Sequence, residues 1–195
     1  MKLVLATSNR GKLAEMQPLL QDLGFSLVTQ SELGVQDAIE DGLTFVENAL
    51  IKARHACRCT GLPAVADDSG LIVDALDGAP GLISAHYAGV HGDAAGNIGK
   101  LLAALHGVPD AQRTARFYSL IVLLRHADDP QPLIVEGLWE GRILDAPRGV
   151  GGFGYDPVFF DPALGLGAAE LSAEIKNVVS HRGRALAALR ERLAT

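Results

Sequence analysis

The chain has 195 residues, of which 48% are hydrophobic and 21% charged, and its formal net charge is −6. This length suits one domain with a substantial buried core. The acidic balance argues against a nucleic-acid polymer as a partner, because phosphate backbones favour basic surfaces. The apolar runs are short, 120–124 being typical, whereas a membrane helix needs roughly 20 apolar residues. The N-terminal residues become polar too soon for a secretion signal. We therefore expect a cytoplasmic protein without a membrane association.

The predicted elements begin with alternating strands and helices. Residues 2–7 (KLVLAT) form a short apolar run that ends in polar residues, which is typical of a buried strand. Apolar residues then recur with helical spacing as far as Leu23, and Gly24 ends this helix. A strand is predicted at 25–29, and Thr44 is the predicted N-cap of a helix that runs to about residue 60.

The second part of the chain is richer in strands. The two strongest strand patterns, 115–126 and 132–144, are joined by a short polar segment and are predicted to pair antiparallel. The other predictions are a short strand at 62–66 with DDSG (67–70) at its end, a strand and turn from residue 71, a helix at 93–106, a strand in PVFF (157–160), a Gly/Ala-rich connector and a final helix at 181–193. Together they indicate a mixed α/β fold in a single domain, residues 1–195.

One glycine-rich stretch, GVGGFG (149–154), matches the letters of the dinucleotide fingerprint G-x-G-x-x-G. That fingerprint follows the first strand of a βαβ unit and opens a helix. Here it lies late in the chain and leads into DPVFF, which Pro157 and the aromatic and β-branched residues make extended. The dinucleotide interpretation is therefore rejected. The concentration of aromatic residues around this stretch leaves open a piece of core, a cofactor loop or a slot for a flat ligand.

The turn TSNRGK (7–12) has the right context for an anion. It follows a strand and opens a helix, so free backbone N–H groups and the helix dipole face whatever lies in the turn. Lys12 is a cation in the first helical turn, which is unfavourable unless an anion is present. The stretch is not a Walker A motif. The alternative is a capped turn with a surface lysine.

Two acidic pairs suit a divalent cation. Asp67 and Asp68 are neighbours on a strand and point to opposite faces, so only one of them can serve a site directly. Glu40 and Asp41 form the second pair, in a loop before a helix. Magnesium prefers one or two carboxylates together with waters and substrate phosphates. Either pair alone is also compatible with a turn or a helix cap.

Further cations lie at positions that fit an anion. Lys52 shares a helix face with Asn48. Ser180 is the predicted N-cap of the last helix, which leaves His181 and Arg182 in its first turn. A Ser–His nucleophile pair is rejected, because neighbouring side chains diverge there and no G-x-S-x-G elbow is present.

Taken together, the chain resembles the inosine triphosphate pyrophosphatase family, and most closely its bacterial branch of dITP/XTP pyrophosphatases. The resemblance covers almost the whole chain in order, from about residue 3 to about residue 187. The matching stretches are LATSNRGK, GLTFVENALIKARHA, LPAVADDSGL, GAPGLISAHYAG, GGFGYDPVFF and SHRGRAL.

This resemblance implies an elongated α/β domain with a long central mixed sheet flanked by helices, and two lobes around a substrate cleft. It also implies a homodimer. The implied reaction is Mg²⁺-dependent cleavage of non-standard purine nucleoside triphosphates (ITP, dITP, XTP) between the α- and β-phosphates. The products are the nucleoside monophosphate and pyrophosphate, and the reaction keeps deaminated purines out of DNA and RNA.

The resemblance also assigns site residues. Asp68 would accept the proton and, with Glu40, hold the metal. Phe153 would stack on the purine. The substrate would contact Thr7, Ser8, Asn9, Arg10, Gly11 and Lys12 in the first turn, then Lys52, Ser69 and Lys176, with Phe153, Gly154, Tyr155, Asp156, His181 and Arg182 around the base.

Two positions depart from the family pattern. Ser8 replaces a usual glycine, which would cost about 1 kcal/mol if that position requires a positive φ, although its hydroxyl could contact a phosphate. His86 stands where arginine is commoner, so a positive charge there would depend on protonation. Two alternatives remain: a related pyrophosphatase acting on modified pyrimidine or guanine nucleotides, and a non-catalytic nucleotide sensor.

Overall fold

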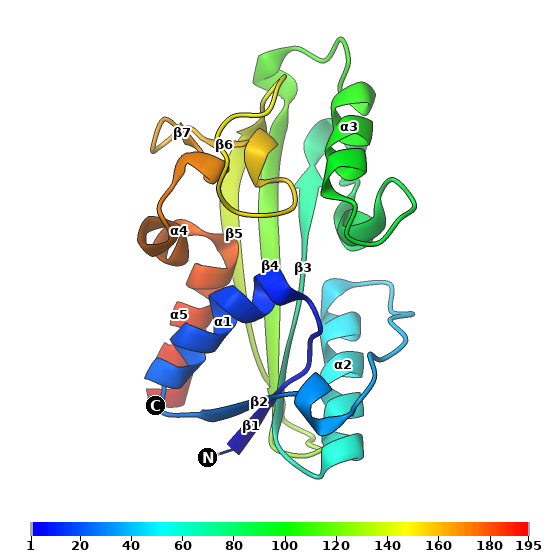
Figure 1. The fold of residues 1–195 in the computed structure, drawn as a ribbon, viewed down its shortest axis with the longest axis vertical. Coiled ribbons are helices and arrows are strands. Elements are labelled where there is room, and N and C mark those ends of the chain that lie inside the picture. Colours follow the sequence, from blue (N-terminus) through cyan, green and yellow to red (C-terminus); the bar gives the residue numbers. More distant parts are fainter. Residues whose placement is uncertain (1, 195) are drawn as a thin grey trace. The chain divides into compact units, whose positions relative to one another are not determined.

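The computed structural model describes residues 2–194, which form an α/β fold around one seven-stranded sheet (Figure 1). The strand order is β2-β1-β3-β4-β5-β6-β7. The strands are β1 (Lys2–Leu5), β2 (Ser26–Thr29), β3 (Ala64–Val73), β4 (Thr114–Leu124), β5 (Leu133–Ile143), β6 (Phe159–Asp161) and β7 (Leu166–Gly167). The helices are α1 (Arg10–Asp22), α2 (Phe45–Thr60), α3 (Ala94–Ala104), α4 (Ala173–Val179) and α5 (His181–Ala194).

The sheet is mixed, as predicted. β1 pairs in parallel with both β2 and β3, whereas β6 pairs antiparallel with β5 and β7. β4 and β5 are neighbours joined by residues 125–132, a connection too short for a parallel crossover. The predicted α/β class and this strand pair are thus confirmed.

By its internal contacts the chain divides into two compact units. Unit 1 comprises Met1–Asp68, Ser119–Gly137 and Arg182–Thr195. Unit 2 comprises Ser69–Tyr118 and Leu138–His181. Each unit has its own hydrophobic core.

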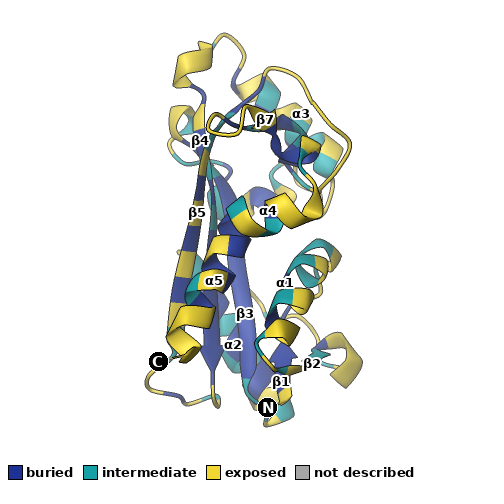
Figure 2. Cartoon of the chain, turned by 90° about the vertical axis from the view of Figure 1, so that its left-hand side faces the viewer, coloured by how far each residue is buried: buried dark blue, intermediate teal, exposed yellow. Residues whose placement is uncertain are grey.

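In unit 1, the core lies where α1 and α5 pack on the sheet. Figures 1 and 2 show these two helices on one side of β3 and α2 on the other. Met16 and Leu20 of α1 meet Ala185 and Leu189 of α5, and all four are fully buried. The apolar spacing of each helix therefore faces the sheet.

In unit 2, the core is built around aromatic side chains. The ring of Phe117 lies 4.5 Å from that of Phe159 and 6.0 Å from that of Trp139. The indole N–H of Trp139 donates to the Asp161 carboxylate at 2.8 Å, which satisfies its buried polar group. Phe159 of β6 is fully buried, whereas Phe160 is only half-buried beneath the Arg142 guanidinium.

Three local predictions were wrong. DDSG does not follow a strand but lies inside β3, because ion pairs satisfy the charges of Asp67 and Asp68 within the sheet. The Gly/Ala-rich connector contains α4, whose N-cap Ser172 accepts the N–H of Ile175. The start of DPVFF is a 3₁₀ turn, Asp156–Val158, in place of extended chain.

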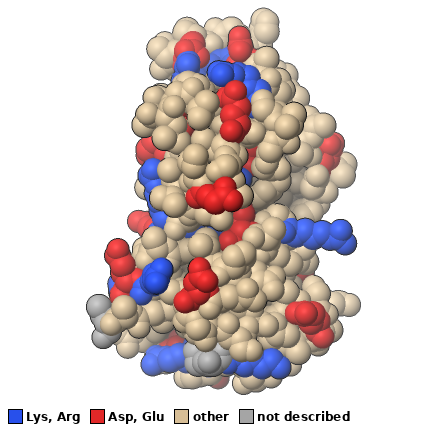
Figure 3. All heavy atoms as spheres, turned by 60° about the vertical axis from the view of Figure 1, so that its left-hand side comes forward, with Lys and Arg blue, Asp and Glu red and all other residues tan. Residues whose placement is uncertain are grey.

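None of the helices within residues 2–194 combines the length and apolar character needed to span a bilayer. On the face drawn in Figure 3, Lys and Arg side chains are interspersed with Asp and Glu side chains.

Candidate active-site residues

The turn at residues 7–12 joins β1 to α1 in unit 1, and its side chains hold its shape. Asn9 is the N-cap of α1, and its Oδ1 accepts the N–H of Lys12 at 3.1 Å. Thr7 Oγ1 accepts the N–H of Asn9 at 3.2 Å. Arg10 and Gly11 are the first residues of α1, and the Arg10 side chain is exposed. The turn thus presents the start of a helix, where backbone N–H groups favour an anion.

Ser8 is not strained. Among the described residues, Asp77 is the one non-glycine position with a positive φ, so the expected cost at Ser8 does not arise. The Ser8 hydroxyl donates to Asp37 Oδ2 at 2.6 Å. The hydroxyl considered as a phosphate contact is therefore committed to a carboxylate.

Asp67 is the hub of a buried ion cluster in unit 1. Its Oδ2 lies 3.2 Å from Lys12 Nζ and 3.4 Å from Arg182 Nε, and its side chain is 0% exposed. Arg182 also pairs with Glu15 of α1. Burial opposes the charge on Asp67, but Lys12 and Arg182 outweigh it and hold the pKa of this carboxyl well below its usual range.

For Lys12, in contrast, the effect of burial on the pKa outweighs that of the neighbouring charges. Burial is the largest influence on this ammonium group and lowers its pKa, and the attraction of Asp67 only partly compensates. A bound anion would add a second negative charge beside Lys12 and stabilise its protonated form.

Asp68 belongs to a second cluster in unit 1, with Lys52 and Glu40. Lys52 Nζ lies 2.9 Å from Asp68 Oδ1 and 2.9 Å from Glu40 Oε2. Burial raises the pKa of Asp68 in spite of Lys52. Burial also opposes the charge on Lys52, but the neighbouring carboxylates prevail and raise its pKa. The adjacent residues of β3 thus serve different partners, as strand geometry requires.

In unit 2, the loop at 149–156 brings an aromatic ring and an ion pair together. Asp156 Oδ2 accepts the N–H of Phe153 at 2.8 Å and lies 2.6 Å from Lys176 Nζ. The same ammonium group lies 5.0 Å from the centre of the Phe153 ring. Lys176 and Asp156 are buried, whereas 39% of Phe153 is exposed. A flat ligand could therefore reach the Phe153 ring.

Glycine is required at two positions of this loop. Gly149 and Gly152 have φ values of +80° and +72°. A Cβ at Gly149 would lie 2.6 Å from the backbone of Ala169, and one at Gly152 would lie 2.0 Å from Asp156 Oδ2. The glycines thus allow close backbone packing, while Val150 between them is fully exposed.

The remaining predicted residues of unit 2 have varied environments. Tyr155 is buried, and its hydroxyl donates to the Ser84 carbonyl at 2.9 Å. His181 is buried and stacks on Phe117 at 4.8 Å. Ser69 is half-buried on β3, Gly154 has a φ of +62°, and His86 is exposed at the end of the 3₁₀ segment Gly81–His86.

Sequence reasoning missed Glu15 and Asp37, and it considered Asp67 only as one of an acidic pair, without its partners Lys12 and Arg182. Glu15 lies three residues after Lys12, a spacing that places both on one helix face and could have flagged it. The pair of Asp67 and Arg182 is separated by 115 positions and leaves no local signal.

The fold and these residues define a class of α/β proteins that gather lysines and carboxylates at a strand-to-helix turn and on the neighbouring strand. The chain matches the Ham1 family over residues 3–192. It belongs to this family.

Curated relatives match over nearly their whole length. The dITP/XTP pyrophosphatase of Xylella fastidiosa (strain 9a5c) is 62% identical over 194 residues, which cover 100% of this chain and 98% of the relative. The dITP/XTP pyrophosphatase of Xanthomonas campestris pv. campestris (strain 8004) is 63% identical, with 98% and 96% covered.

Solved structures agree with the fold. A HAM1 protein from Coxiella burnetii superimposes with a TM-score of 0.92 at 51% identity, covering 100% of this chain and 98% of the other. A nucleoside-triphosphatase / dITP/XTP pyrophosphatase from Mycobacterium abscessus gives a TM-score of 0.78 at 47% identity, covering 97% and 98%.

Proposed function

We propose that this protein hydrolyses non-standard purine nucleoside triphosphates (dITP, ITP and XTP) to the nucleoside monophosphate and pyrophosphate. The curated relatives, named dITP/XTP pyrophosphatases, support the activity across the full chain. The observation that carries the proposal is the cluster of Asp68, Lys52 and Glu40, which combines a possible proton acceptor, a phosphate-binding cation and a second acidic group.

The donor set of this cluster fits Mg²⁺. One oxygen of Asp68 and one of Glu40 lie at 2.9 Å from the same lysine nitrogen, so one cation already bridges the two carboxylates. Among residues 2–194, no group of three or more acidic, histidine or cysteine side chains gathers at one point. Two carboxylates completed by waters and phosphate oxygens are what Mg²⁺ prefers. When bound, the ion would neutralise phosphate charge and stabilise the departing pyrophosphate.

The groups of unit 1 would hold the triphosphate and the attacking water. The turn of Thr7, Ser8, Asn9, Arg10, Gly11 and Lys12 would receive phosphate oxygens through its backbone N–H groups and the Lys12 ammonium, and Lys52 would add a second cation. Asp68 would take a proton from a water whose oxygen bonds to the α-phosphorus while the bond to the β-phosphate oxygen breaks. Pyrophosphate leaves with the electrons of that bond.

The groups of unit 2 would hold the base. The exposed Phe153 ring would stack on the purine, and the buried contact of Asp156 with Lys176 fixes the loop that carries this ring. Gly154, Tyr155, His181 and Ser69 would shape its surroundings. Lys176 lies beside Phe153 and Asp156, which favours a place near the base over the phosphate contact expected from the resemblance. The resemblance also gives Arg182 a role in binding the base, and in unit 1 this guanidinium is engaged by Asp67 and Glu15.

We further propose that residues 1–195 act as one catalytic domain in a homodimer. The protein would work in the cytoplasm on free nucleotides. Full-length coverage of the relatives supports the first point, and the net charge of −6 supports the preference for free nucleotides over a nucleic-acid polymer.

Pyrophosphate release from ITP, XTP, ATP and GTP with Mg²⁺ tests this function. We expect rapid release from ITP and XTP only. An Asp68→Asn variant should lose about 10²- to 10⁴-fold in rate, the range for a general base. Asp128→Asn, an exposed control with the same charge change, should keep the wild-type rate. Binding of ITP without release would favour a sensor, and comparable release from ATP would contradict the proposed selectivity.

A further inference from the structure

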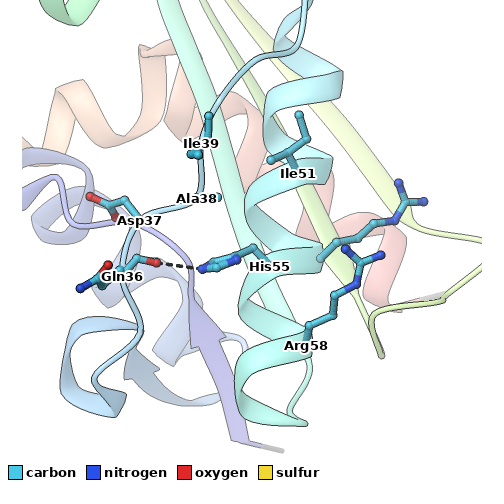
Figure 4. Close-up of a pocket in the computed structure, with 8 residues that line it drawn as sticks. Gln36, Asp37, Ala38, Ile39, Ile51, His55 and Arg58 are labelled. Atoms are coloured by element: carbon cyan, nitrogen blue, oxygen red, sulfur yellow. Dashed lines mark hydrogen bonds between the residues drawn. The ribbon is translucent and has the colours of Figure 1, made fainter.

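The segment at 35–42, which carries Glu40, has no regular secondary structure and is held by side chains. His55 Nε2 donates to the Gln36 carbonyl at 3.0 Å, as Figure 4 shows, and the Gly42 N–H donates to Asn48 Oδ1 at 2.9 Å. Glu40 itself is joined to Lys52. These three partners, His55, Asn48 and Lys52, all lie on α2, so the segment runs along this helix.

The middle of the segment packs poorly against α2. A pocket of about 630 Å³ lies between them, lined by Ala38 and Ile39 of the segment and by Ile51 and His55 of α2, among others (Figure 4). Ile39 is 84% exposed. A few hydrogen bonds and one ion pair therefore fix the position of this part of the chain more than apolar packing does.

Asp37 makes hydrogen bonds on the side of the segment that faces away from α2. Its side chain points away from α2 in Figure 4. Its Oδ2 accepts the Ser8 hydroxyl at 2.6 Å, and its Oδ1 accepts a hydrogen bond from the Gln30 amide. Ser8 belongs to the 7–12 turn, so one carboxylate joins this turn to the segment that carries Glu40.

We propose that Asp37 and Ser8 are positioning residues that couple the 7–12 turn to Glu40. Only two residues separate Asp37 from Glu40, so the hydrogen bond from Ser8 limits how far the Glu40 carboxylate can move from the turn. The inference rests on the proposed function, in which the turn receives phosphates and Glu40 helps to hold Mg²⁺. Loss of the bond would loosen the segment and weaken the metal site without removing a reacting group.

Hydrogen–deuterium exchange of the ligand-free protein tests the effect of the hydrogen bond between Ser8 and Asp37 directly. In Asp37→Ala and in Ser8→Ala we expect the amide of Gly42, which donates to Asn48 Oδ1, to exchange about three- to tenfold faster, the factor for one exposed hydrogen bond. Ser8→Thr keeps the hydroxyl and should restore the wild-type rate. Asp41→Ala removes a neighbouring exposed carboxylate and serves as the matched control, with no change expected. The amides of β1 report on global stability.

The double variant and the Mg²⁺ dependence complete the test. If one bond carries the effect, the double variant exchanges no faster than Asp37→Ala alone. In Asp37→Ala, the Mg²⁺ concentration for half-maximal pyrophosphate release should rise about threefold, with kcat at saturating Mg²⁺ within twofold of wild type. Unchanged exchange in Asp37→Ala, additive effects, or a Ser8→Thr variant as fast as Ser8→Ala would each overturn the inference. Exchange needs no substrate, so a failure of the proposed activity is seen separately.

Discussion

Replacing the Asp67 carboxylate should destabilise the protein more than any surface charge change. In Asp67→Asn, the shape of the side chain is kept, but Lys12 and Arg182 lose their shared negative partner. Breaking a buried ion pair costs about 3–5 kcal/mol, because the remaining charge is left uncompensated. Arg182 keeps Glu15, and the Lys12 side chain is 14% exposed, so we expect the lower end, about 3 kcal/mol.

Urea denaturation at pH 7, followed by far-UV circular dichroism, measures this loss. With a typical slope of about 2 kcal/mol per M, the midpoint should fall by about 1.5 M. Asp110→Asn is the control. Asp110 pairs with Arg142 at the surface with 69% of its side chain exposed, and it should cost less than about 1 kcal/mol. An equal loss of unfolding free energy in the two variants would refute the assignment of Asp67 as the buried partner of Lys12 and Arg182.

The same experiment has a pH dependence. The pKa of Asp67 is lower in the folded protein than its ordinary value of 3.8. Its contribution to stability is therefore complete well above pH 4 and is lost as the pH falls below that value. The difference between wild type and Asp67→Asn should shrink in acid and stay constant between pH 6 and 8.

Three further predictions concern unit 2. Tyr155→Phe removes a buried hydroxyl and should lower the free energy of unfolding by about 1–2 kcal/mol. Burial raises the pKa of this phenol, so the stability that the hydroxyl contributes is complete below about pH 10 and is lost as the pH rises above it. Urea denaturation on both sides of pH 10 measures this loss. Gly141→Ala places a Cβ 2.5 Å from the Phe159 ring and should lower the melting temperature, whereas Gly99→Ala, with no atom within 4 Å, should raise it; shifts of the same sign would contradict the packing argument. Trp139→Phe leaves the buried carboxylate it contacts without its indole donor and should cost about 2–4 kcal/mol in thermal denaturation, and a cost below 1 kcal/mol would refute this.

Elements with local signals could be predicted from the sequence. The helix α2 begins after Thr44, whose hydroxyl accepts the N–H of Glu47, and ends before Gly61 with a φ of +67°. The residues that define each end lie within a few positions of that end, because a capping residue acts on the nearest turn. The same holds for the 7–12 turn and its Asn9 cap.

Features that depend on distant parts of the chain could not be predicted. Two adjacent aspartates inside a buried strand look unfavourable until the lysines and Arg182 that neutralise them are known. The helix α4 has seven residues, too few for a clear helical period. The commitment of the Ser8 hydroxyl to Asp37 depends on the path of a segment without secondary structure.

The glycine loop of unit 2 also determines how this stretch can diverge in sequence. At Gly149 and Gly152, any side chain meets both an unfavourable backbone conformation and an occupied space, so drift at these positions should be eliminated by selection. Val150 has no such constraint and is free to vary. A saturation library across 149–152 should therefore tolerate many residues at position 150, beside two positions fixed as glycine.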